Sequence, residues 1–116
     1  NVMAAKLNGG SGAVLANGVA VALAETLTLP SGTPIHVAVR ADRMRLGAAS
    51  GNGTVLQGTA RAVEYFGPTV QLGIDVAGLD PLSASVTEHS FFAAPVQPGD
   101  PVAVTWSPED MHVIER

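Results

Sequence analysis

The sequence predicts an all-β protein built from two related modules, and three observations support this prediction. The 116 residues include 13 glycines and 8 prolines spread along the chain, and both residue types interrupt helices. Short apolar runs that alternate with polar residues lie between turn-forming residues, a pattern typical of strands. One stretch also occurs twice, because GTPIHVAVRADRMRL at 32–46 matches GDPVAVTWSPEDMHV at 99–113 without gaps. Such a repeat indicates one supersecondary unit per copy.

The first half should begin with a strand at 2–7, after which apolar runs flank Asn17-Gly18. This pair can supply the two positive φ angles of a type I′ turn, so we expect a β-hairpin formed by residues 13–16 and 19–24. A single Ala-rich helix over 13–25 is the alternative, and an Asn-Gly pair in its middle would destabilise it.

A β-prone run at 26–29 ends at Pro30, and the first repeat copy follows it. In that copy Ile35, Val37 and Val39 alternate with His36, Ala38 and Arg40, which predicts a half-buried strand. A polar corner and a second short apolar run complete each copy.

The second half opens with a long strand pattern at 54–66. Its apolar face shifts phase after Ala62, which predicts a β-bulge, and mid-strand Gly58 predicts a bend. Further strands are indicated by alternating apolar residues, namely Val70, Leu72, Ile74 and Val76, then Leu82, Ala84 and Val86, then Val102, Val104 and Trp106. Between the last two, Phe91-Phe92 looks loop-like. Short strands at this spacing favour small barrels like the OB-fold.

We therefore expect OB-fold-like small barrels built from two related, interleaved β modules. The first module is placed at 1–46, a flexible linker at 47–53 (GAASGNG) and the second module at 54–116. Modules below about 70 residues are marginally stable alone, so the two should form one compact unit.

Composition narrows the possible functions. The chain has no cysteine, which excludes disulfides and thiolate chemistry. No apolar run reaches the roughly 20 residues of a membrane span, no signal peptide is recognisable, and a start at Asn1 in mid-pattern suggests a piece of a longer protein. With a net charge of −4 and six Lys and Arg residues, nucleic-acid binding is disfavoured.

The sequence predicts no catalytic, cofactor or metal site in this chain. The Gly-rich stretches at 9–12 and 47–53 lack the lysine of a phosphate-binding loop. The three histidines, His36, His89 and His112, lack zinc-ligand spacing, and His36 and His112 should face solvent. The carboxylates show no acid–base pair, and Glu109-Asp110 matches Asp42-Arg43 of the other copy as a structural corner. Ser90 beside His89 is discounted because neighbours on a strand point to opposite faces.

Two aromatic pairs, Tyr65-Phe66 and Phe91-Phe92, have two equally weighted interpretations. In an extended segment one ring of each pair should point away from the barrel interior. The outer rings either cover a satellite core or contact a partner, since interfaces are enriched in aromatic residues. These four residues are the candidate partner interface.

Several segments taken together resemble the TOBE domain, the C-terminal OB-fold regulatory domain of bacterial ABC importer ATP-binding subunits. The segments are GTAR at 58–61, VEYFG at 63–67, VQPGDPV at 96–102 and WSPEDMHV at 106–113. In the first half, VRADRMRL at 39–46 is similar to the family stretch V-R-P-E-x-(I/L/M)-x-L, with Ala41 and Asp42 replacing Pro and Glu. The resemblance covers the whole chain, and the subgroup it looks most like serves polyamine (spermidine/putrescine) and ferric-iron importers.

The resemblance implies a non-catalytic regulatory and dimerisation domain that pairs with a second copy of its subunit. ATP and Mg²⁺ would be bound by the parent ATPase domain, with no cofactor in this chain. The implied partners are that ATPase domain and, indirectly, the transporter's membrane subunits. The implied location is cytoplasmic, peripheral to the inner membrane through the transporter complex.

A second hypothesis is a small-oxyanion-binding module, because the TOBE fold is similar to the molybdate-binding Mop-type modules. Thr87-x-x-Ser90 resembles their pattern, but the basic residue expected near Trp106-Ser107 is missing. A third hypothesis, an OB-type nucleic-acid binder, would need stacking aromatics in a basic groove, and the negative net charge disfavours it.

Overall fold

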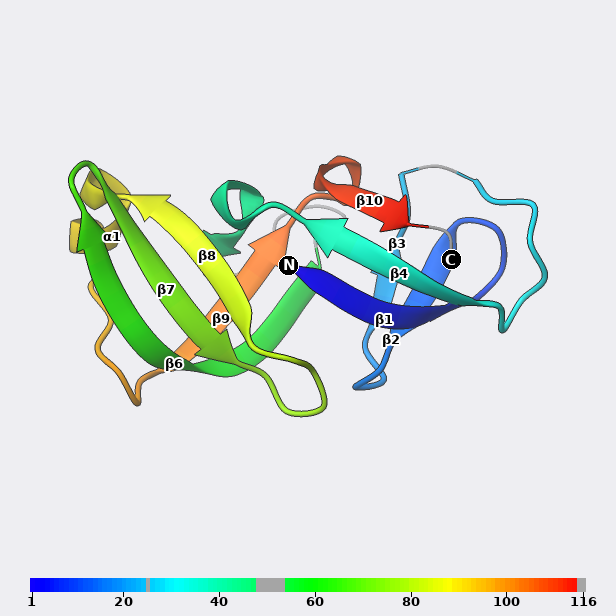
Figure 1. Cartoon of the computed structure of the whole chain (residues 1–116), viewed down its shortest axis with the longest axis horizontal. Helices are drawn as coiled ribbons and strands as arrows, with labels where there is room; N and C mark the ends of the chain where they lie inside the picture. Colours follow the sequence, from blue (N-terminus) through cyan, green and yellow to red (C-terminus); the bar gives the residue numbers. More distant parts are fainter. Residues whose placement is uncertain (25, 48–53, 115–116) are drawn as a thin grey trace.

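The computed structural model describes residues 1–24, 26–47 and 54–114. The molecule is elongated, with extents of 43 × 24 × 23 Å. Two five-stranded antiparallel sheets lie next to each other along the long axis, and the N-terminus lies between them (Figure 1). The all-β prediction is confirmed, with one short helix and two 3₁₀ turns added.

Both sheets are antiparallel, and each contains one strand from the other half of the chain. The first sheet has the order β10-β4-β1-β2-β3, with β1 at Val2–Leu7, β2 at Gly12–Leu15, β3 at Ala20–Ala22, β4 at Pro34–Val39 and β10 at Met111–Ile114. The second has the order β5-β9-β6-β7-β8, with β5 at Arg45–Leu46, β6 at Thr54–Phe66, β7 at Thr69–Asp75, β8 at Leu82–Thr87 and β9 at Pro101–Trp106.

The two repeat copies exchange their last strands. Strand β5 follows the first copy's β4 in sequence but pairs with β9, with Arg45 opposite Thr105. Strand β10 pairs in return with β4, with His112 opposite Ala38, and the repeat aligns these two residue pairs with each other. The predicted interleaving is therefore confirmed. The division at 47–53 stays a prediction, and all of that segment except Gly47 lies outside the described residues.

The predicted polar corners are 3₁₀ turns at equivalent places, η1 at Ala41–Arg43 and η2 at Pro108–Asp110. Arg43 Nε lies 4.0 Å from Asp110 Oδ1, so the two corners are close together. The Asn1 side chain also links the sheets, because its Nδ2 donates to the Val39 carbonyl and to the Ser83 carbonyl at 2.8 Å. Ser83 N–H donates back to Asn1 Oδ1 at 2.6 Å.

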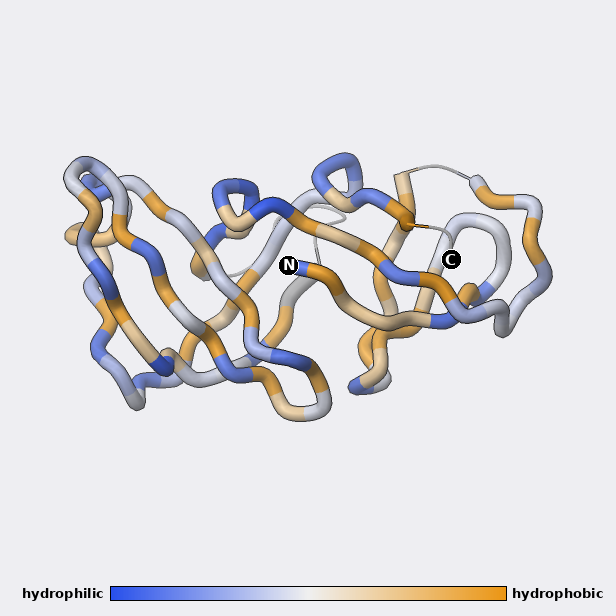
Figure 2. Tube along the Cα trace, viewed as in Figure 1, coloured by the Kyte–Doolittle hydropathy of each residue, from blue (hydrophilic) through white to orange (hydrophobic). Residues whose placement is uncertain are grey.

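One hydrophobic cluster runs through both sheets, and the inward residues predicted from alternation belong to it. Buried side chains include Ile35, Val37 and Val39 in β4, Val70, Leu72 and Ile74 in β7, and Val102, Val104 and Trp106 in β9. Figure 2 shows the alternation of hydrophobic and hydrophilic residues along the strands of the second sheet. The apolar period of two therefore identified the core face of these strands.

The hairpin at Asn17-Gly18 is confirmed, but its predicted turn type is wrong. Strands β2 and β3 pair around it, which also excludes the alternative helix. Among the described residues only glycines have positive φ, so Asn17 cannot occupy a type I′ position, whereas Gly18 has φ 89°. Gly18 N–H donates to the Leu15 carbonyl at 2.8 Å, so the turn is a four-residue one that ends on the glycine. The β-prone run at 26–29 forms no strand.

The predicted irregularity of β6 is confirmed as a register shift against β7 between Ala60 and Ala62. Close approach explains Gly58, since a Cβ there would lie 2.6 Å from the Asp75 carbonyl oxygen. The backbone of β6 can therefore pass next to β7 only because residue 58 has no side chain.

The loop expected around Phe91-Phe92 is instead a helix, α1 at Glu88–Ala93. Thr87 is its N-cap, and its hydroxyl oxygen accepts a hydrogen bond from Ser90 N–H at 3.1 Å. Successive helical residues point about 100° apart, so Phe91 is buried while Phe92 is exposed. No helix in the described part of the chain has the length and apolarity needed to cross a bilayer.

Candidate functional site

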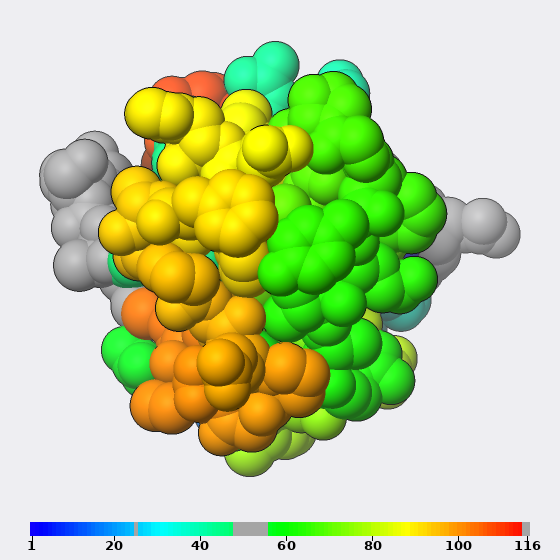
Figure 3. Space-filling model, turned by 90° about the vertical axis from the view of Figure 1, so that its left-hand side faces the viewer, coloured from blue at the N-terminus to red at the C-terminus, as the bar shows by residue number. Residues whose placement is uncertain are grey.

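The end of the second sheet carries three exposed aromatic side chains, Tyr65, Phe66 and Phe92, which we call the aromatic patch. Their exposed fractions are 62%, 53% and 56%. The Tyr65 and Phe92 rings are stacked, with centroids 6.3 Å apart. Figure 3 views this end of the molecule and shows the surface of α1 directly against that of β6.

Phe91 lies beneath the aromatic patch and supports it. It is only 2% exposed, and its ring makes edge contacts with Tyr65 at 5.9 Å and with Phe92 at 5.4 Å. Of the four residues of the predicted interface, three are therefore on the surface and Phe91 belongs to the core.

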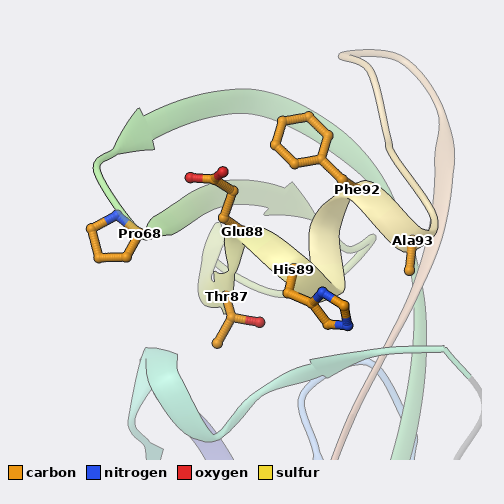
Figure 4. A pocket seen from close by; sticks show the side chains of 6 residues that line it. All are labelled: Pro68, Thr87, Glu88, His89, Phe92 and Ala93. Carbon is orange, nitrogen blue, oxygen red and sulfur yellow. The ribbon is translucent and has the colours of Figure 1, made fainter.

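A shallow hollow of about 790 Å³ lies beside the aromatic patch, around α1. Its lining residues are Pro68, Thr87, Glu88, His89, Phe92 and Ala93. Figure 4 shows that Glu88, His89 and Phe92 project from α1 in different directions. An acid–base mechanism needs groups that converge on one reacting atom, and these groups do not converge.

A second pocket, of about 350 Å³, lies between β5 and β8, and we call it the seam pocket. One wall comes from η1 and β5, and the other from β8 and α1. The lining residues are Asp42, Met44, Arg45, Leu46, Ser85, Val86, Thr87, Ser90, Phe91 and Ala94. The exchange of β5 into the second sheet thus brings first-half residues to this pocket.

The polar groups of the seam pocket suit an anion with several oxygens. Arg45 is exposed and forms no ion pair with any residue that the structure describes. Ser85, Thr87 and Ser90 contribute hydroxyl groups, and the Thr87 oxygen accepts from Ser90 N–H, which leaves its proton free to donate. A guanidinium and hydroxyl donors are the groups that bind oxyanions in charge-assisted hydrogen bonds.

One lining residue works against an anion. Asp42 in η1 lines the pocket, on the wall that also contains Arg45. Arg40 pairs with the Asp42 carboxylate, with Nη2 and Oδ2 2.7 Å apart on the surface. Arg40 therefore partly offsets the repulsion that Asp42 exerts on an anion.

Comparison with known proteins identifies the family. The family model of the TOBE domain matches residues 37–114. The chain belongs to the TOBE domain family.

A solved structure with the same fold covers this TOBE chain from end to end. It is the cytoplasmic molybdate-binding protein ModG in a crystal form with molybdate bound. The TM-score is 0.84 at 18% sequence identity, and the alignment covers 100% of this chain and 96% of ModG. At this identity the likeness establishes the fold. No curated protein matches the chain in sequence.

Sequence reasoning found part of the seam pocket of the TOBE chain and missed the rest. Thr87 and Ser90 were singled out because Thr87-x-x-Ser90 resembles the pattern of the Mop-type modules, and both line the pocket. Arg45 was missed as their partner because a basic residue was sought near Trp106-Ser107. The exchanged strand places Arg45 opposite Thr105, next to that position. The position of Arg45 next to Trp106 follows only from the pairing of β5 with β9. The repeat indicates that β5 and β10 are equivalent strands, but it does not show which strand each one pairs with.

The remaining candidates lie apart from the seam pocket. His36 and His112 are exposed, as predicted from the alternation, and both belong to the first sheet. His89 is on α1 beside the aromatic patch. Within residues 1–24, 26–47 and 54–114, no three or more His, Asp or Glu side chains are grouped so as to hold a metal ion.

Proposed function

We propose that this TOBE chain is a non-catalytic binding module that holds a small oxyanion, of the molybdate or sulfate class, in the seam pocket. The observation that carries the proposal is that Arg45 lines one pocket together with the hydroxyl-bearing residues Ser85, Thr87 and Ser90. The likeness of the whole chain to a molybdate-binding protein supports the same ligand class.

Substitution of Arg45 tests this proposal. Isothermal titration calorimetry with molybdate, tungstate and sulfate should show binding to the unmodified chain. Arg45→Ala should weaken that binding about 10- to 100-fold, because a hydrogen bond to a charged group contributes about 1.5–3 kcal/mol. Asp42→Asn should strengthen it about two- to fivefold, since it removes a like charge from an exposed position.

Arg43→Ala is the matched control for Arg45→Ala. Arg43 is two residues away, also exposed, and lies near Asp110 rather than in the seam pocket. Both variants lose one positive charge, so equal effects on affinity would mean that only net charge matters. Equal effects, or no heat with any of the three anions, would overturn the proposal.

A second candidate function is that of a regulatory and dimerisation domain of an ABC transporter ATP-binding subunit, serving import of a polyamine, iron or a similar small solute. The exposed aromatic patch favours it, because its three rings lie at one end of the molecule and interfaces are enriched in aromatic residues. The resemblance of the sequence to such domains runs along the whole chain. In this role the module would act mechanically in the cytoplasm, next to the parent's ATPase domain.

For this candidate, the aromatic patch is expected to contact a second copy of the chain. Phe92→Ser should then weaken self-association at least about tenfold, since aromatic anchors at interface centres contribute about 2 kcal/mol or more. Sedimentation equilibrium of the chain gives the association constant. In the full-length parent, the same variant should change subunit pairing or ATP turnover.

Val2→Ser is the control, because Val2 is similarly exposed at 54% and lies outside the aromatic patch. A chain that stays monomeric and a parent with unchanged ATP turnover would exclude the dimerisation role. The two candidates are separable because Arg45→Ala should leave self-association unchanged and Phe92→Ser should leave oxyanion affinity unchanged.

A further inference from the structure

The seam pocket lies between two strands that do not pair with each other. In the order β5-β9-β6-β7-β8, strands β5 and β8 are the opposite edges of the second sheet. Both nevertheless line one pocket, and η1 packs against β8. The sheet therefore curls until its edges face each other, and the pocket marks the seam of this half-closed barrel.

The Asn1 side chain already covers part of the β8 edge of this seam. The carboxamide of Asn1 makes both backbone hydrogen bonds of Ser83 in β8, accepting from its N–H at 2.6 Å and donating to its carbonyl at 2.8 Å. Asn1 thus takes the place that a neighbouring strand would fill. Two residues farther along β8, Ser85 is the first β8 residue that lines the seam pocket.

We infer that an oxyanion in the seam pocket acts as a clasp between the two edges of the second sheet. Arg45 would donate to it from β5, while the hydroxyls of Ser85, Thr87 and Ser90 would donate from β8 and α1. This inference rests on the proposed oxyanion binding and adds what binding does to the protein. Strand β5 has only two residues, so a bond from Arg45 to β8 through the ligand holds the exchanged strand in place.

The clasp makes a quantitative prediction about local opening. When the seam opens, the two walls of the site separate and the ligand must leave. Any backbone amide that exchanges through this opening is then protected by the factor 1 + [ligand]/Kd. At a molybdate concentration of 100 times Kd, exchange of these amides should slow about 100-fold.

Residue-resolved amide hydrogen exchange by NMR, with and without molybdate, measures this protection. Gly47 N–H reports on the β5 side, since it donates to the Ala103 carbonyl at 2.9 Å, and Ser83 N–H reports on the β8 side. Leu23 N–H, which donates to the Ser11 carbonyl in the first sheet, is the reference. We expect both seam reporters to slow about 100-fold and the reference to change little. In Arg45→Ala the effect should disappear from Gly47.

Other outcomes separate the clasp from the binding function on which it rests. If molybdate binds and only Ser83 N–H is protected, the ligand contacts β8 but does not hold β5. This result would overturn the clasp and leave the proposed binding function intact. Equal slowing of all three reporters would show stabilisation of the whole chain and would also overturn the clasp. If molybdate does not bind at all, both proposals fail together.

Discussion

Replacing Trp106 by alanine is expected to lower the free energy of unfolding by about 3–5 kcal/mol. Trp106 is the only tryptophan of the chain and is 1% exposed at the end of β9. Its removal takes the largest side chain out of the core next to the exchanged strand and leaves a cavity that the paired strands cannot fill. Urea denaturation followed by circular dichroism measures the loss.

Trp106→Phe is the informative control for this variant. No described residue accepts a hydrogen bond from the buried indole N–H of Trp106, and a buried donor without a partner costs about 1–3 kcal/mol. Phenylalanine keeps most of the apolar volume and removes that donor, so its net cost should stay below about 1.5 kcal/mol. A loss as large for phenylalanine as for alanine would show that the indole N–H has a stabilising partner.

The strands could be predicted from the sequence because apolar side chains in this chain alternate with few exceptions. The bounds of β1 and β6 match the expected 2–7 and 54–66, since both strands show the alternation clearly and end at turn-forming residues. The β-prone run at 26–29 forms no strand, because β propensity alone does not make a strand. The run joins neither sheet, and Leu27 N–H donates to the Gly10 carbonyl at 2.7 Å.

Helix α1 was missed for a different reason. Glu88–Ala93 is too short to show an apolar period of 3.6, and Phe91-Phe92 resembles the start of a strand. The local feature that could have identified it is Thr87, whose hydroxyl caps the Ser90 amide. The turn type at Asn17-Gly18 was also predicted wrongly. An Asn-Gly pair fits a type I′ turn, but it equally fits a turn in which only the glycine has positive φ.

The candidate site was less predictable than the fold because it depends on long-range pairing. Thr87 and Ser90 are close in sequence, and Thr87-x-x-Ser90 was singled out because it resembles the pattern of the Mop-type modules, whereas Ser85 was not singled out. Arg45 lies 40 or more residues from them and reaches the seam pocket only because β5 pairs with β9 instead of a strand of its own half. No local pattern near Arg45 encodes that exchange.

Replacing Gly58 by alanine is expected to destabilise the second sheet by about 2–3 kcal/mol, at the upper end of the cost of overpacking. A Cβ at this position would lie 2.6 Å from the Asp75 carbonyl oxygen and 2.9 Å from Val76 Cγ2. The first of these atoms belongs to the backbone of β7, so relief requires the two strands to move apart where β6 bends. Thermal and urea unfolding of the variant measure the cost.

Gly73→Ala is the matched control, because Gly73 lies in β7, next to the same strand β6. A Cβ there would meet Arg61 Nη2 at 3.4 Å and Ala62 Cβ at 3.8 Å, which are ordinary contacts. This variant should change stability by less than about 0.5 kcal/mol or increase it, since alanine reduces the entropy of the unfolded chain. Equal effects of the two substitutions would show that the glycine at 58 serves the flexibility of the strand instead of the close approach of β6 to β7.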